Sequence, residues 1–160
     1  MSIKKLTDNQ GREWKLSVTF PVLRTIKEEV PFDLLASQNV YKSVQEFLGL
    51  DWATQLDCIG EAVRPNHENF DVMKFAEGID EDVLTAGVFL FLESLADFFP
   101  SQSQIILKVL TRARAELMQN RAEATAKLES GLDEMLNVAL RQAGNVSGSS
   151  QATQDSTPTT

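Results

Sequence analysis

One cysteine and one histidine, Cys58 and His67, are the residues of this 160-residue chain best able to carry catalysis or bind a metal. A paired thiol and imidazole could perform nucleophilic chemistry, and NHENFD places Glu68 and Asp71 near His67 as carboxylate ligands. The chain has no second histidine or cysteine to complete a zinc set, and no flanking catalytic signature. We therefore interpret Cys58 as a small buried hydrophobe and His67 as a solvated loop residue. A small hydrolase or metal enzyme built on them is kept as an alternative.

The acidic run Asp80, Glu81 and Asp82 is the other group with possible chemistry. It directly precedes a long apolar stretch, which favours the N-terminus of a helix, where side-chain oxygens cap free N–H groups and the macrodipole stabilises negative charge. We therefore predict that Asp80 caps a helix. No catalytic, cofactor-binding or metal-binding residue is assigned, and we expect a protein that is not an enzyme.

The overall composition narrows the class of protein. The net charge is −8, which disfavours binding to nucleic acid and to an anionic membrane surface, because both need clustered Lys and Arg. A single cysteine cannot form an internal disulfide, and MSIKKLTDNQ lacks the apolar stretch of a secretory signal. We expect an intracellular, soluble protein whose apolar residues, 42% of the chain, form one core.

A β-hairpin is predicted at the N-terminus. Apolar and polar residues alternate in REWKLSVTF, which is the period of a half-buried strand, and TDNQG before it has the residue types of a tight turn that allows positive φ. Residues 3–7 should therefore pair back antiparallel. A lone ribbon is marginal in water, so its apolar face should rest on helices. The residues expected on that face are Trp14, Leu16, Val18 and Phe20.

Four short helices are predicted next, over about residues 21–30, 41–48, 52–63 and 71–77. Asn39 and Asp51 should cap the second and third helices, and Gly78 is suited to a left-handed C-cap after the fourth. The residues expected to share an apolar face are Val22, Leu23, Ile26 and Val30 in the first helix, and Trp52, Leu56, Ile59 and Val63 in the third.

The most apolar stretch of the chain, VLTAGVFLFLESLADFFP, should form a helix that ends at Pro100. Its 17 residues before the proline include Glu93 and Asp97, so it is too short and too charged for a membrane span, which needs about 20 apolar residues. Its apolar arc exceeds the roughly 100° of an ordinary surface helix. The helix is therefore either central and covered on both sides, or it leaves aromatic surface for a partner. The candidate partner-binding residues are Phe89, Phe91, Leu92, Phe98 and Phe99.

A long C-terminal helix is predicted after Pro100, with apolar residues at three-, four- and seven-residue steps and a possible bend or break at Gly131. From Gly144 the sequence is rich in Ser, Thr and Gln, so residues 144–160 should form a flexible, disordered tail. The expected fold is mainly α with a short N-terminal antiparallel hairpin, as one compact helical domain over residues 1–143. The recurring apolar residues are Ile106, Leu110, Ala113, Leu117, Ala124, Leu128, Leu132 and Met135.

Three of these features occur in a distinctive order: the strand GREWKLSVTF, a helix running into VPFDLL, and FAEGIDEDVLTAGVFLFLESLADFFP before a long charged helix. Over roughly residues 8–120 this order resembles small tail assembly chaperones of long-tailed bacteriophages. The resemblance implies a non-enzymatic factor that acts in the host cytoplasm and is absent from the mature virion. Such proteins bind the tape measure protein, keep it soluble and help tail tube subunits gather around it. Many are also made in a longer, frameshifted form.

A different phage morphogenesis or regulatory adaptor would fit the same helical build. In such a protein the long C-terminal helix would serve self-association. Both interpretations predict function through helix–helix contacts, without a cofactor.

Overall fold

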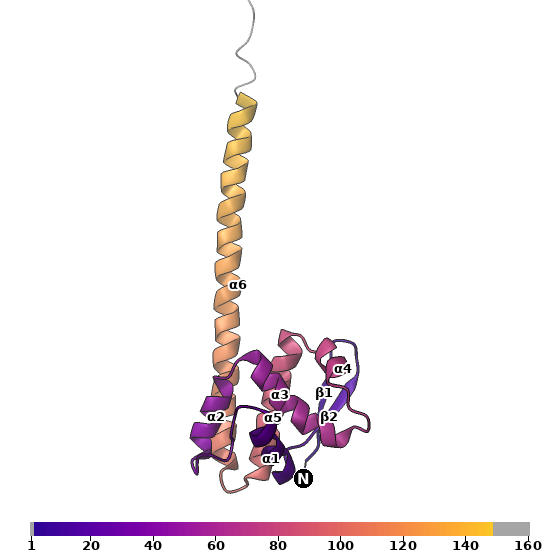
Figure 1. The fold of residues 1–160 in the computed structure, drawn as a ribbon. Coiled ribbons are helices and arrows are strands. Elements are labelled where there is room, and N and C mark those ends of the chain that lie inside the picture. The colour runs from indigo at the N-terminus through magenta and orange to yellow at the C-terminus, as the bar shows by residue number, and fades with distance from the viewer. Residues whose placement is uncertain (1, 149–160) are drawn as a thin grey trace, which may run out of the picture. The chain divides into compact units, whose positions relative to one another are not determined.

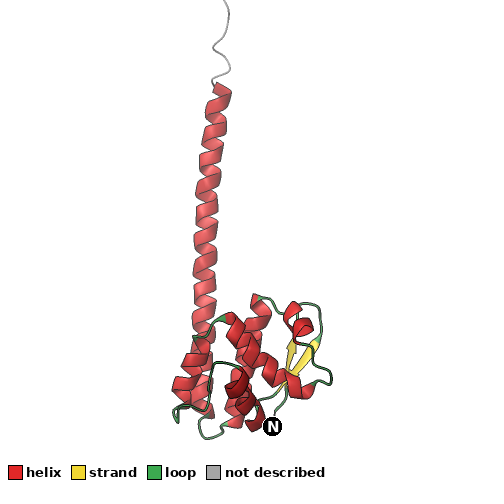
Figure 2. Ribbon diagram, viewed as in Figure 1, coloured by secondary structure: helices red, strands yellow, loops and turns green. Residues whose placement is uncertain are grey.

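The computed structural model describes residues 2–148 and is mainly helical, with one antiparallel hairpin (Figures 1 and 2). The predicted fold class is therefore confirmed. A first compact unit ends at Arg114, and the chain from Ala115 onward belongs to a second, so the expected boundary at residue 143 falls inside the second unit. The elements are β1 (Lys4–Thr7), β2 (Glu13–Leu16), α1 (Phe20–Glu29), α2 (Val40–Leu48), α3 (Trp52–Val63), the short 3-10 helix η1 (Arg64–Asn66), α4 (Val72–Glu77), α5 (Glu81–Phe98) and α6 (Ser103–Gly148).

Side-chain caps set the starts of the helices. Asn39, Asp51 and Asp80 accept hydrogen bonds from backbone N–H groups in the first turns of α2, α3 and α5, which confirms the three predicted caps. Thr19 caps α1 in the same way. The chain therefore turns into a helix before Phe20, whose side chain is exposed, and the prediction that Phe20 lies on the buried strand face is wrong.

The core of the first unit is built on the predicted apolar faces. Val22, Leu23 and Ile26 of α1 are buried, and so are Ile59 and Val63 of α3. The first turn of α3 differs from expectation, because its tryptophan at position 52 is 62% exposed. The stripe on α3 therefore begins one turn later than its spacing predicted.

The hairpin packs against helices, as expected because an isolated two-stranded ribbon is only marginally stable in water. Leu6 pairs with Trp14 in the antiparallel register, and β1 contacts α5 while β2 contacts α3. Gly11 lies in the turn with φ of +79°, which confirms a turn with positive φ. Leu16 is fully buried, so the strand face that points inward becomes part of the core.

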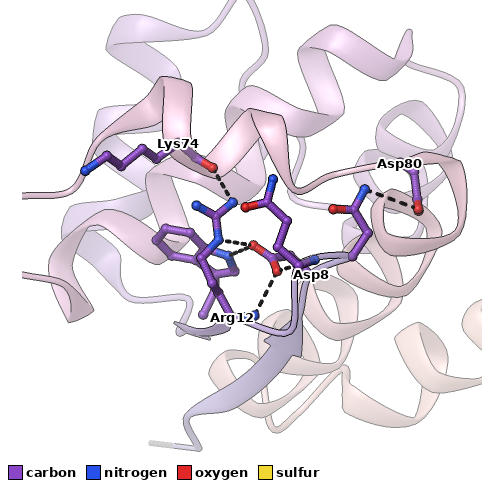
Figure 3. A network of polar contacts seen from close by, with 7 residues as sticks. Asp8, Arg12, Lys74 and Asp80 are labelled. Atoms are coloured by element: carbon purple, nitrogen blue, oxygen red, sulfur yellow. Dashed lines mark hydrogen bonds and ion pairs between the residues drawn. The ribbon is translucent and has the colours of Figure 1, made fainter.

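A buried carboxylate ties this turn to the end of α4 (Figure 3). Asp8 accepts hydrogen bonds from the side chains of Arg12 and Trp14, at 2.7 and 2.9 Å, and Arg12 also donates to the Lys74 carbonyl oxygen at 2.7 Å. A Cβ on Gly78 would overlap the Asp8 carboxylate. Gly78 has φ of −93°, so a left-handed C-cap is the wrong reason for glycine here, and close approach of Asp8 is the right one.

α6 is unbroken through Gly131 and continues through Gly144 to Gly148, beyond the predicted start of the tail. A single glycine costs about 1 kcal/mol relative to Ala, which a long cooperative helix can absorb. Ile106 and Leu110 at its beginning are buried in the first unit. Residues 149–160 of the predicted tail lie outside the described residues.

Candidate protein-interaction surfaces

The five candidate residues of α5 and its C-terminus divide between the core and the surface. Phe91 and Leu92 are fully buried, and Phe91 stacks on Phe47 of α2 with 4.9 Å between ring centroids. Neither can contact a partner as the protein stands, so their choice as binding residues is corrected. Phe89, Phe98 and Phe99 are half-buried. α5 is therefore largely a central helix with a partly open aromatic edge.

The half-buried ring of Phe89 is covered by an arginine. The guanidinium carbon of Arg114 lies 4.8 Å from the ring centroid, and the same side chain forms an ion pair with Glu93 at 2.7 Å. The ion pair holds the cation over the ring, where it is attracted by the negative π face. Much of the apolar flank of α5 is thus occupied by a side chain of the same unit.

Phe98 and Phe99 form an edge-to-face pair with 4.8 Å between ring centroids at the end of α5. Asp97 beside them forms an ion pair with Lys4 of β1 at 3.1 Å. Both rings pack against the core and keep a partly exposed surface.

The second unit offers a larger apolar surface, on α6. Five exposed side chains recur at i, i+4, i+7, i+8 and i+11, so they lie on one face of the helix. The four large side chains of this set have exposed fractions from 63% to 71%. We call this set the α6 stripe: Leu128, Leu132, Met135, Leu136 and Ala139.

Cys58 and His67, the two residues best able to carry catalysis, both make contacts that serve the fold. Cys58 is fully buried in α3, and burial, together with the charge of Asp57, raises the pKa of its thiol to about 12. The thiol is thus protonated at neutral pH and has no thiolate with which to attack, which confirms that Cys58 is a buried hydrophobe. His67 is half-buried, so it is not a freely solvated loop residue: its Nε2 accepts a hydrogen bond from the Lys15 N–H at 2.8 Å and its ring packs on Trp14.

Within residues 2–148, no three His, Cys, Asp or Glu side chains gather in a way that could hold a metal ion. None of the described helices is long and apolar enough to cross a membrane.

Comparison of the chain with protein-family models, with curated proteins and with solved structures gives no match.

Other exposed apolar residues were not expected at a surface. Trp52 was placed in the core by its spacing, and Val72 and Met73 of α4 were not singled out. One signal was present in the sequence, the shortness of the helix predicted over residues 71–77. In the structure α4 has six residues, and Phe75 alone is buried. A helix that short cannot turn its other large apolar side chains inward as well.

Proposed function

We propose that this protein is a non-enzymatic tail assembly chaperone of a long-tailed bacteriophage, which binds the tape measure protein, keeps it soluble and promotes assembly of the tail tube around it. It would act in the host cytoplasm and be absent from the mature virion. Two observations support the proposal: the order of features in the sequence, and the exposed α6 stripe in the structure.

The α6 stripe supports a client that is itself helical. Helices in proteins gain most of their stability by packing an amphipathic face, and apolar side chains at i, i+4 and i+7 are the usual anchors for a second helix. A tape measure protein, long and rich in helical segments, would supply such faces repeatedly. The acidic net charge of −8 would keep the complex soluble.

Co-expression tests the proposal. The full chain would be produced together with the tape measure protein, which the proposal expects to be long, helix-rich and encoded beside it, and the soluble fraction of that client would be measured. We expect the wild-type chain to raise client solubility and to elute with it in gel filtration. If solubility is unchanged and no complex elutes, the proposal is wrong.

Matched variants assign the effect to the stripe. Leu128→Glu with Leu132→Glu should abolish the gain in solubility, because two charges would be buried in the helix contact. Ala126→Glu with Asn137→Glu adds the same two charges to exposed positions on the opposite face of α6 and should leave the gain intact. If the two double variants change client solubility equally, the α6 stripe is not the surface that binds the client.

A second candidate function is an adaptor that self-associates through the same stripe. Light scattering on the purified chain separates the two functions. A stable oligomer that dissociates in the Leu128→Glu, Leu132→Glu variant, without any effect on a client, would favour the adaptor.

A further inference from the structure

An apolar groove in the first unit lies between α3, α4 and the C-terminal end of α1. It has a volume of about 330 Å³, with buried Gly60 and Phe75 at its base and half-buried Leu56 and Phe70 beside them. Gly60 keeps the base open, because even a Cβ there would already contact the two phenylalanine rings at 3.8 to 4.0 Å.

Exposed apolar side chains extend the groove outward. Val72 and Met73 of α4 line it and are 50% and 68% exposed. Trp52 lies one helical turn before Leu56 on α3, so it continues the same face. Trp and Met are enriched at protein interfaces, and exposed apolar side chains beside a groove are typical of an interaction site.

The rim of the groove is acidic. Glu29, Asp57 and Glu61 line it, and among the described lining residues Arg64 is the only cation. Arg64 is already bound to Glu61, at 2.8 Å, and lies over the Phe70 ring. The rim therefore presents a net negative charge next to an apolar base.

We propose that this groove binds an amphipathic helix of a partner protein, with apolar side chains in the groove and Lys or Arg beside them facing Glu29 and Asp57. Grooves between helices accept helices through anchors at i, i+4 and i+7. The negative rim selects a basic partner and opposes an anionic lipid surface or nucleic acid. The groove lies in the first unit, so the proposal does not depend on the α6 stripe or on the identity of its client.

A designed peptide provides the probe. It has about 18 residues, enough for a marginally stable isolated helix, with Leu at i, i+4, i+7 and i+11, Lys at the flanking positions, Ala elsewhere and a fluorescein label. Binding to the full chain is followed by fluorescence anisotropy at several salt concentrations. We expect saturable binding that weakens with salt, and no binding of the same peptide with Glu in place of Lys.

Substitutions locate the binding site. Met73→Ser should weaken binding about tenfold through the loss of a buried anchor, whereas Tyr41→Ser, at an exposed position on α2, should leave it unchanged. Glu29→Gln with Asp57→Asn should weaken binding about fivefold and reduce its salt dependence. Glu123→Gln with Glu129→Gln, on α6, is the charge-matched control. Circular dichroism and thermal unfolding should match the wild-type chain, because all these side chains are exposed.

Four results of the peptide-binding experiments would overturn the proposal. These are failure of the peptide to bind the wild-type chain, equal binding of the Glu peptide, binding that Met73→Ser leaves intact, and binding that the α6 variant Leu128→Glu, Leu132→Glu removes. A dimer of the chain that Met73→Ser dissociates would also overturn it, since the groove would then be an interface between copies.

Discussion

The hydroxyl oxygen of Ser94, in the C-terminal half of α5, accepts a hydrogen bond from the backbone N–H of Val18 at 2.8 Å. Both residues are buried, and 76 positions of the chain separate them. This bond joins the segment after β2 to the central helix and satisfies an N–H group that the two-stranded sheet leaves without a strand partner.

Ser94→Ala should lower the free energy of unfolding by about 1–3 kcal/mol, because the Val18 N–H would stay buried without a partner. Urea unfolding at neutral pH measures the change. The control is Ser43→Ala, since the Ser43 hydroxyl is buried in α2 and has no hydrogen-bond partner among the described residues. That variant should be as stable as wild type or up to about 1 kcal/mol more stable. A large loss there would show that the Ser43 hydroxyl has a partner in solution.

Phe91→Ala should cost about 3–5 kcal/mol, as is typical of a fully buried phenylalanine. Phe89→Ala should cost less, about 1–2 kcal/mol, because the Phe89 ring is half-buried and its main polar contact is the Arg114 guanidinium. Chemical denaturation of the two variants gives the comparison. Equal losses would mean that Phe89 is a core residue and that the partly open edge of α5 is closed in solution.

Gly60→Ala and Gly87→Ala should change stability in opposite directions. Each glycine lies inside a helix, where Ala is favoured by about 1 kcal/mol. A Cβ at Gly60 would make ordinary contacts, whereas one at Gly87 would lie 3.2 Å from Ile59 and 3.3 Å from Leu6. We expect Gly60→Ala to raise the midpoint of thermal unfolding and Gly87→Ala to lower it. A higher midpoint for Gly87→Ala would show that the side-chain ends of Ile59 and Leu6 can shift at little cost.

Asp8 should make the protein sensitive to acid. Burial raises the pKa of this carboxyl, but hydrogen bonds from Trp14, Arg12 and Gln10 outweigh burial and lower the pKa from 3.8 to about 2. A pKa that is lower in the folded state means that the ionised form stabilises the fold. This contribution, about 2 kcal/mol at about 1.4 kcal/mol per pKa unit, is fully present above pH 4 and is lost as pH falls towards 2.

The measurement is urea unfolding of wild type and Asp8→Asn between pH 7 and pH 2. The stability difference between the two proteins should shrink by about 2 kcal/mol over the range from pH 4 to pH 2. Other carboxyl groups titrate in both proteins, so the difference isolates Asp8. A constant difference would contradict the role given to the ionised carboxylate.

Local signals were the most predictable part of the fold. Asn39, Asp51 and Asp80 were identified as caps because a capping side chain acts within three residues of its own position. The buried face of α1 was likewise predictable, because helical spacing relates residues only three or four positions apart. These features depend on neighbours in the chain, which the sequence displays directly.

Features that depend on distant neighbours were harder to predict. The spacing of Trp52 predicted burial, and that of Leu92 left burial and exposure open. Only the packing of other elements makes Trp52 exposed and Leu92 buried. Similarly, the three- and four-residue steps predicted α6 but not that its large apolar residues from Met118 to Leu140 are exposed. The groove combines α1, α3 and α4, so no single stretch of sequence contains it.

The close approach of Gly78 to the Asp8 carboxylate also has an evolutionary consequence. A side chain at position 78 would displace the Asp8 carboxylate. If that carboxylate were absent, the steric requirement for glycine at position 78 would be absent too. Positions 8 and 78 should therefore vary together among descendants of this sequence. A descendant that lost the aspartate would be free to accept alanine at the end of α4, and an aspartate regained after that would collide with the alanine Cβ.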